Sequence, residues 1–332
     1  MRELVARAPV RIDFGGGWTD VPPYTTDQGG CVCSVAISRY ARATLRSRPG
    51  GIRIDEDGVE RFAPGAWELS SDARKTLASV ALARSGIDLV DLELRADFPR
   101  GAGLGGSSAA GVALQRAFAA WLGEHVPPEA LAERSRLTEV EGLGVAGGSQ
   151  DHYAAAFGGA LGMHFTDRVV VERIGLSEAT RAALEQQCTV VYTGESRISA
   201  ETINGVMDAY RAGDAGVTGA LAEMRTLAHR MIDALKLGDI DGLGALVGEH
   251  WRHQRALHAR ITTPAIERVL EVARGAGAIG GKALGASGGG CVLVIAPESA
   301  SERVRAAVAD VRECELLEFR VDEHGATVEE RE

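Results

Sequence analysis

The sequence of 332 residues is 45% hydrophobic and 25% charged, which is an ordinary globular composition and enough chain for two domains. Its formal net charge of −10 argues against a general nucleic-acid or anionic-membrane binder, because such proteins usually carry a basic excess. No apolar run approaches the roughly 18 residues of a membrane span, and residues 1–9 lack the apolar core of a signal peptide. We therefore expect a cytoplasmic enzyme or binding protein.

The first half of the chain is predicted to contain strands and then helices. Hydrophobic periodicity predicts strands at four places: 5–14, 30–46, 51–69 (short strands with turns) and 89–98. It predicts helices at three places: 72–85, 107–122 and about 128–141. The last of these begins at a proline pair, and proline is tolerated in the first turn of a helix.

The second half changes character after the glycine-rich stretch that ends near residue 160. Short strands are predicted at 169–174 and 188–192, followed by a long helical block over 199–275. Glycine or a Thr-Thr-Pro sequence should interrupt this block at three places: Gly213, Gly238 and Thr262–Pro264. A final strand, helix and strand are predicted at 291–297, 299–312 and 315–321.

The cysteines and one histidine cluster are interpreted as packing or surface residues. The five cysteines are scattered, and the C-x-C of Cys31 and Cys33 lies in an apolar strand, which favours small buried side chains over a metal or disulfide role. The spacing of His250, His253 and His258 puts only the first two on one helical face, so a partly exposed helix surface is favoured over a zinc site.

The first of three glycine-rich islands lies between a predicted strand and a predicted helix. Residues 101–106 read GAGLGG, and Ser107 and Ser108 follow at the start of the helix. A helix N-terminus exposes unpaired N–H groups, and glycine lets backbone come close to phosphate oxygens. The two hydroxyls could cap the helix, contact phosphate, or ligate a Mg²⁺ carried by a nucleotide.

Two other glycine-loop classes are alternatives for this island. The letters match G-x-G-x-x-G, but a dinucleotide fold would need a second parallel strand with an acidic residue, and here another helix follows. A P-loop would need Lys-Ser/Thr after the glycines, which is not present. Plain helix capping would explain one serine and not the glycines.

The other two islands add carboxylates and a tight loop. Glu139 and Glu141 are predicted near a helix end and Asp151 after a glycine turn. One such carboxylate could bind Mg²⁺ and another orient or deprotonate a hydroxyl, although paired glutamates are also typical of a solvated face. The third island, 280–290, suits a loop that packs against another loop or a ligand, and its Lys282 either touches phosphate or points to solvent.

Together the islands resemble the galactokinase, homoserine kinase, mevalonate kinase and phosphomevalonate kinase (GHMP) superfamily. Its central signature is similar to residues 99–109, PRGAGLGGSSA, with Gly106 in place of a serine. The opening APVRIDFGGGWTDVPPY and the ending GASGGG resemble its first and third motifs. The branch of heptose 7-phosphate and L-fucose kinases shares these motifs in the same order across residues 8–296.

The resemblance implies roles for particular residues. A nucleotide-binding set is implied: Gly101, Gly103, Leu104, Gly105, Gly106, Ser107 and Ser108. Ser108 and Glu139 would bind Mg²⁺, Asp151 would act as general base or orienting group, and Arg11 would lie beside it. A substrate-binding set is also implied: Gly16, Gly17, Thr19, Asp20, His152, Arg197, Gly285, Ser287, Gly288 and Gly289.

The implied fold is α+β, with an N-terminal domain like ribosomal protein S5 domain 2 (1–175) and a ferredoxin-like C-terminal domain (176–332). The implied activity is ATP- and Mg²⁺-dependent phosphorylation of a sugar or sugar phosphate, at its anomeric oxygen. His152, Ser287 and Trp18 depart from the usual residues of the heptose kinases, and GGWTD is closer to the fucokinases. A cyclitol kinase, a decarboxylase and a non-catalytic regulator of the same fold stay open, as does a homodimer.

Overall fold

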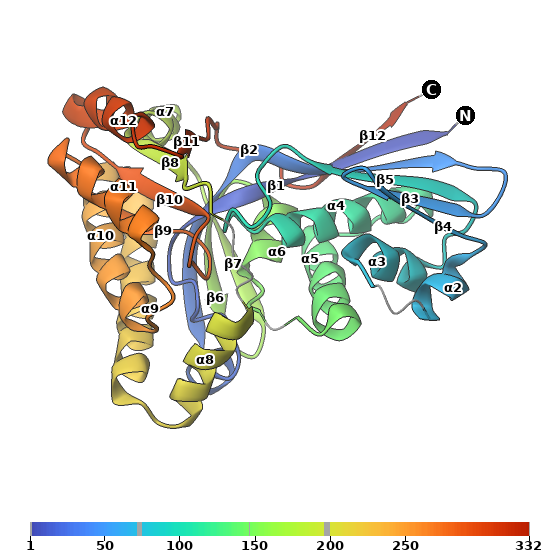
Figure 1. The fold of residues 1–332 in the computed structure, drawn as a ribbon, viewed down its shortest axis with the longest axis horizontal. Helices are drawn as coiled ribbons and strands as arrows, with labels where there is room; N and C mark the ends of the chain where they lie inside the picture. Colours follow the sequence, from blue (N-terminus) through green and yellow to red (C-terminus); the bar gives the residue numbers. More distant parts are fainter. Residues whose placement is uncertain (1, 72–74, 146, 196–199, 332) are drawn as a thin grey trace.

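The computed structural model describes residues 2–71, 75–145, 147–195 and 200–331. Two β-sheets with helices packed against them make up this part of the chain (Figure 1). The two chain ends lie side by side at the far end of the larger sheet (Figure 1).

Within the described residues, eight strands form the larger sheet, in the order β12-β1-β2-β5-β3-β4, with β6 paired to β2 and β7 to β6. The strands are β1 (Glu3–Gly15), β2 (Gly30–Ser47), β3 (Ile52–Glu56), β4 (Val59–Ala63), β5 (Val90–Ala96), β6 (Ala160–Phe165), β7 (Val169–Ile174) and β12 (Thr327–Arg331). β3 and β5 run parallel, and the other pairs run antiparallel. β2 pairs with β6 over 30–35 and with β5 over 41–47, so one strand joins the two ends of the sheet.

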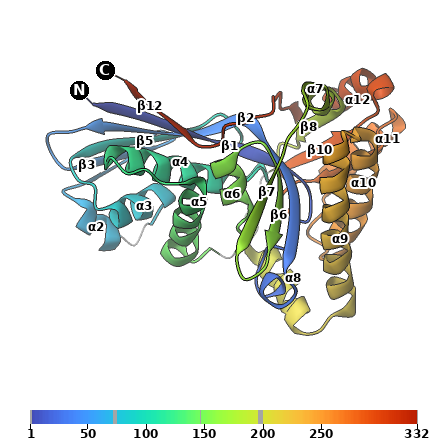
Figure 2. The same cartoon turned by 180° about the vertical axis from the view of Figure 1, so that it is seen from behind.

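Helices α2 to α6 cover one face of this sheet (Figures 1 and 2). The helical segments of this part are α1 (Tyr24–Gln28), α2 (Ala66–Ser71), α3 (Leu77–Ser85), α4 (Gly106–Trp121), α5 (Pro128–Leu137), a π-helical turn (Thr138–Gly142) and α6 (Gln150–Phe157). α4 is rich in small apolar residues that are buried against β1 and β2. This packing fixes the N-terminus of α4 next to the first strand.

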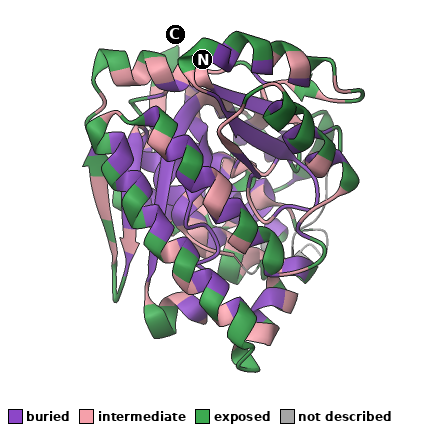
Figure 3. Ribbon diagram, turned by 90° about the vertical axis from the view of Figure 1, so that its left-hand side faces the viewer, coloured by how far each residue is buried: buried purple, intermediate pink, exposed green. Residues whose placement is uncertain are grey.

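The smaller sheet is antiparallel, in the order β11-β8-β10-β9. Its strands are β8 (Cys188–Tyr192), β9 (Gly280–Ala283), β10 (Cys291–Ile295) and β11 (Glu315–Leu316). The helices of this half are α7 (Glu178–Gln187), α8 (Ala200–Arg211), α9 (Ala215–Leu237), α10 (Ile240–Ala256), α11 (Pro264–Gly275) and α12 (Ser301–Ala309). Seen from this end, the helices bury one face and expose the other (Figure 3).

The predicted breaks in the long helical block are confirmed, and side-chain caps explain them. Asp214 accepts the backbone N–H of Gly216 and Val217 at the start of α9, and Asp239 accepts that of Gly242 at the start of α10. Thr263 caps α11, and the following proline occupies its first turn. Such caps stabilise a helix by about 1 kcal/mol each and fix where it begins.

The sequence-based prediction of the elements was incomplete and in two places wrong. Six elements were not predicted: α1, α6, β6, α7, β9 and β12. The sequence predicts a loop where α6 lies, because a glycine turn directly precedes it. In the structure the three successive alanines of α6 are all buried. Residues 66–71 form a helix instead of strand. The strand predicted over 315–321 ends at Leu316, where β11 ends. The backbone carbonyl of Arg320 then accepts the N–H of Ser38 on β2, so residues 317–321 bridge the two sheets.

The last strand returns to the first, because β12 pairs antiparallel with β1. Residues 327–331 therefore belong to the larger sheet, and the domain division at 175/176 stays a prediction. Among the described residues, no helix combines the length and apolar character needed to cross a bilayer.

Candidate active site

The first glycine island forms a loop that leads from β5 into α4. Gly101, Gly103 and Gly105 have φ of 68°, 75° and 75°, a region that favours glycine over residues with a Cβ. α4 begins at Gly106, and no side chain caps it within the described residues. The serine hydroxyls are therefore not used as caps, and the N–H groups of the first turn face the cavity that the loop lines.

The third island packs directly onto the first, as its composition predicts. A Cβ on Gly103 would lie 2.5 Å from the Leu284 carbonyl oxygen, and one on Gly285 would lie 2.9 Å from that of Gly103. The Cys291 N–H also donates to the Ala102 carbonyl at 2.8 Å. The two loops are thus locked together by backbone.

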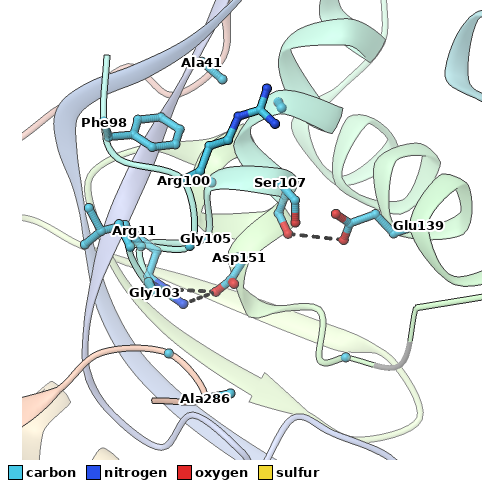
Figure 4. A pocket seen from close by; sticks show the side chains of 18 of the residues that line it. Arg11, Ala41, Phe98, Arg100, Gly103, Gly105, Ser107, Glu139, Asp151 and Ala286 are labelled. Carbon is cyan, nitrogen blue, oxygen red and sulfur yellow. Dashed lines mark hydrogen bonds and ion pairs between the residues drawn. The ribbon is translucent and has the colours of Figure 1, made fainter. Parts of the chain in front are cut away.

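Arg11 and Asp151 form an ion pair beside this loop (Figure 4). The Arg11 Nε and Nη2 atoms lie 2.8 Å and 2.7 Å from Asp151 Oδ1, and Nη1 donates to the Gly103 carbonyl at 2.7 Å. Arg11 is on β1 and only 2% exposed, while Asp151 is in the first turn of α6 and opens to the cavity. Among the described residues, Asp151 Oδ1 takes these bonds, so Oδ2 is left for a ligand.

Glu139 lies on the other side of the α4 N-terminus (Figure 4). Its Oε2 atom is 3.5 Å from Ser108 Oγ and 3.1 Å from His152 Nε2, and Ser135 Oγ is 2.9 Å from His152 Nδ1. Burial raises the pKa of Glu139, but the contact with His152 and the serine hydroxyls outweigh burial and lower it. Glu139 is therefore an ionised carboxylate beside two hydroxyls, a donor set of hard oxygens that fits Mg²⁺.

Asp20 defines the opposite end of the cavity. Its Oδ2 accepts the backbone N–H of Gln150 at 3.0 Å, and a Cβ on Gly148 would clash with the same carboxylate. Burial raises the pKa of Asp20 to about 6. Thr19 Oγ1 donates to the Gly16 carbonyl at 2.7 Å and accepts the Cys31 N–H at 3.1 Å, which holds the turn around Asp20.

A buried ion pair lies under this end. Lys282 Nζ is 2.9 Å from Asp13 Oδ2, and the two residues are 0% and 2% exposed. Burial alone would raise the pKa of Asp13, but the positive charges of Lys282 and Arg11 lower it by more. The pKa of Asp13 is therefore below its usual value, and the carboxyl is ionised. His250 accepts the Gly16 N–H at 2.9 Å, and burial lowers its pKa well below the usual value. Lys282 therefore does not point to solvent, which was one of its two predicted alternatives, and the prediction of a partly exposed His250 was wrong, because both side chains support β1 from the C-terminal half.

A cavity of about 510 Å³ joins these features. Most predicted site residues line it: Arg11, Gly17, Asp20, Gly101, Gly103, Leu104, Gly105, Gly106, Ser107, Ser108, Glu139, Asp151 and Gly285. Others lie behind the lining: Gly16, Thr19, His152, Ser287, Gly288 and Gly289. Arg197 falls outside the described residues.

The residues behind the lining have structural contacts instead of ligand-facing ones. His152 is 1% exposed and points to Glu139, so its position does not support the predicted substrate contact. Ser287 Oγ accepts from Gln254 Nε2 at 3.0 Å, and the Gly288 N–H donates to the Ile261 carbonyl at 2.9 Å.

Sequence reasoning missed four residues of the site: Asp13, Gln150, Lys282 and His250. Asp13 follows Arg11 by two positions on a strand, which places both side chains on one face. That spacing was a usable signal. For Lys282 and His250 no local pattern shows the partner, since Asp13 and Gly16 are more than two hundred residues away in the sequence.

A cavity bounded by an uncapped helix N-terminus, a glycine loop and buried carboxylates is typical of a small-molecule phosphotransferase. Sequence models of the GHMP kinase N-terminal and C-terminal domains match residues 72–159 and 231–313. The chain belongs to the GHMP kinases.

Known proteins that are similar to the chain include kinases of sugars and sugar phosphates. A D-glycero-alpha-D-manno-heptose 7-phosphate kinase of Campylobacter jejuni is 29% identical over 87% of this chain and 88% of its own. An L-fucokinase/L-fucose-1-P guanylyltransferase of Bacteroides fragilis is 26% identical over 90% of this chain and 35% of that longer protein. A D-glycero-D-manno-heptose 1-phosphate kinase crystal structure from Bacteroides thetaiotaomicron superposes with a TM-score of 0.81 at 24% identity, covering 99% of both chains.

Proposed function

We propose that this chain transfers the γ-phosphoryl group of ATP to a hydroxyl, the anomeric one, of a sugar or sugar phosphate. One observation carries the proposal: Arg11 holds the Asp151 carboxylate in the cavity between the uncapped α4 N-terminus and the Asp20 turn. A donor bound at the first feature and an acceptor bound at the second would meet at Asp151.

The nucleotide triphosphate would bind over the first turn of α4. The N–H groups there carry partial positive charge, and the glycine loop lets backbone approach the phosphates. Ser108 and Glu139 would hold a Mg²⁺ ion, which neutralises developing phosphate charge when bound.

Asp151 would orient the acceptor hydroxyl and take its proton on Oδ2, because Oδ1 is engaged by Arg11. Arg11 has a second role, since its guanidinium is 2.7 Å from the Gly103 carbonyl and so fixes the phosphate loop relative to the base. Positioning and electrostatics supply most of the catalysis in such transfers.

The acceptor end is polar and suits a polyol. Asp13, Asp20 and Gln150 line it beside Trp18, and carboxylates and amides bind sugar hydroxyls by accepting and donating hydrogen bonds. The proteins named above act on heptose phosphate and on fucose, which supports a sugar or sugar phosphate of similar size as the acceptor. A cytoplasmic location and a homodimer stay predictions.

An ADP-release assay with Mg²⁺-ATP and a panel of acceptors tests the proposal. The panel contains heptose 7-phosphate, L-fucose, glucose and an inositol phosphate, and phosphorus NMR of the product locates the new phosphate. Turnover of a sugar with an anomeric product is expected. If only the inositol phosphate is phosphorylated, the acceptor is a cyclitol and not a sugar. If the protein binds nucleotide but phosphorylates no acceptor, a non-kinase member of the fold is favoured.

A further inference from the structure

Three metal-ligating side chains converge outside the active site, where α9 crosses β2 and β6. Cys31 on β2 and His164 on β6 are directly paired across the two strands. His229 comes from α9, which packs on the same part of β2. Residues from three separate elements therefore meet at one point.

Their ligand atoms are close enough to share an ion. One atom from each residue (Cys31 Sγ and a ring nitrogen of each histidine) lies within 4.8 Å of the other two. Cys31 Sγ is 3.6 Å from His229 Nδ1, which is the separation expected of sulfur and nitrogen ligands on one tetrahedral ion. The histidine rings are stacked, with centroids 5.3 Å apart and an interplanar angle of 24°.

The burial of the three residues gives the site a closed and an open side. Cys31 is fully buried, His164 is half-buried and His229 is exposed. The side of the site that faces solvent is therefore formed by the histidines, with the thiol beneath them.

The charges around the site include two carboxylates, Glu172 and Asp233, and two cations, Lys236 and Arg225. Glu172 Oε2 lies 3.7 Å from His164 Nε2, and its other oxygen is paired with Lys236 Nζ at 2.7 Å. Arg225, one turn before His229, is held by the Gln28 carbonyl. Both cations have partners, and Glu172 can supply a fourth ligand or hold a bound water.

We propose that Cys31, His164 and His229 form a binding site for a thiophilic divalent transition-metal ion of the Zn²⁺ type. One thiolate and two imidazoles suit Zn²⁺ and Co²⁺ and not Mg²⁺, which prefers oxygen ligands. Binding replaces the Cys31 S–H bond by a sulfur–metal bond and releases that proton to solvent, with no change of oxidation state. Cys31 is buried as expected of a packing residue, and the proposal adds a metal-binding role to it, while Cys33 has packing alone.

The site is separate from the proposed Mg²⁺ position but contacts the substrate turn. The backbone of Cys31 bonds to Thr19 Oγ1 through both its N–H and its carbonyl. An ion here would tie β2, β6 and α9 together behind that turn. Metal binding should raise the thermal stability of the protein, since a ligand of the folded state alone stabilises it.

A Co²⁺ titration of the tag-free, reduced full chain, without nucleotide or Mg²⁺, tests the site independently of any kinase activity. We expect one Co²⁺ per chain, an intense sulfur-to-cobalt charge-transfer band, and loss of this band when Zn²⁺ is added, because Zn²⁺ binds more tightly. Cys31→Ser should abolish the band. His229→Ala should weaken binding by more than about tenfold, since losing even an outer partner of a ligand typically weakens it about 10–100-fold.

Two matched variants complete the test. His125→Ala removes an exposed histidine elsewhere, and Cys314→Ser removes a thiol that is partly exposed elsewhere; both should bind Co²⁺ as the wild type does. His229→Ala alters an exposed side chain, so it should unfold at the wild-type temperature without metal and lose the Zn²⁺-induced increase. Absence of the charge-transfer band in the wild type, its persistence in Cys31→Ser, or unchanged affinity in His229→Ala would each overturn the proposal.

Discussion

The two ends of the active-site cavity are built from different parts of the chain. At the nucleotide end the lining is local in sequence, because the loop and the first turn of α4 fall within residues 101–108. At the sugar end, Asp13, Asp20 and Gln150 line the cavity, and Lys282 and His250 support them from the other half of the chain. The phosphate loop at the first end is made of backbone, with Ser108 and Glu139 beside it, whereas the second end is made of paired side chains.

This difference determines which kind of mutation damages each end of the cavity. A backbone site is damaged by adding atoms to glycine, since any substitution other than proline leaves its N–H groups in place. A side-chain site is damaged by leaving a buried charge without its partner, and that effect reaches the fold as well as the ligand.

The largest effect is expected where the two ends meet. Asp151→Asn should lower kcat by about 10²–10⁴-fold, the usual contribution of a positioned base, while ATP affinity changes little because Asp151 is not part of the α4 turn. Steady-state kinetics and a nucleotide-binding titration measure the two quantities. The control Glu141→Gln alters an exposed carboxylate paired with Arg84 and should keep full turnover. Near-normal kcat in Asp151→Asn would remove the base from the mechanism.

Lys282→Met should destabilise the protein by about 3–5 kcal/mol, because it leaves Asp13 buried and unpaired. Denaturant unfolding measures this free energy. Adding Asp13→Asn should recover part of the loss, since the uncompensated charge is then gone. Lys236→Met breaks the surface ion pair with Glu172 and should have a much smaller effect. Equal effects of the two lysine variants would mean that the buried pair does not support the sugar end.

Gly103→Ala should damage the nucleotide end. It combines a φ of 75° with a Cβ 2.5 Å from the Leu284 carbonyl, and strain plus overpacking should cost ~2–4 kcal/mol. Gly123→Ala is the matched control, because Gly123 has a φ of 72° with no atom within 4 Å of a Cβ, so only the ~1–2 kcal/mol of strain remains. ATP affinity should fall in the first variant only; a similar loss in both would show that loop packing does not set the phosphate site.

The same contrast explains how far the sequence could predict the structure. The nucleotide loop, α4 and the helical block follow from local signals: glycine runs, apolar periodicity and caps such as Thr263. Arg11 and Asp151 came from motif resemblance, and their ion pair agrees with the expected proximity.

The missed features depend on tertiary contacts. Nothing near Lys282 in the sequence reveals that Asp13 will neutralise it, because the pair joins strands from opposite halves. α6 is buried on all sides and so lacks the one-sided periodicity that marks a surface helix. The motif resemblance placed His152 with the substrate because it directly follows the predicted base Asp151 in the sequence, but successive helix positions point in different directions.

The smallest effect concerns pH at the sugar end. Because burial raises the pKa of Asp20 from 3.8 to about 6, this carboxyl is protonated in the folded protein below that pH and can no longer accept hydrogen bonds from two hydroxyls of a polyol through both of its oxygens. The kcat/KM for the sugar should therefore fall about tenfold per pH unit below 6, since this parameter reports the free enzyme, while ATP affinity should not follow the same curve.

The stability contribution of Asp20 has the opposite sign. A carboxyl with a raised folded-state pKa favours the folded protein below pH 3.8 and loses that contribution as pH rises through about 6. Acidification thus weakens sugar binding while the Asp20 contribution to folding grows, which separates loss of the ligand site from unfolding. Asp20→Asn should remove both pH dependences, whereas Asp167→Asn, an exposed change, should leave them intact. A sugar kcat/KM profile that keeps its inflection near pH 6 in Asp20→Asn would assign the titration to another group and take Asp20 out of the sugar site.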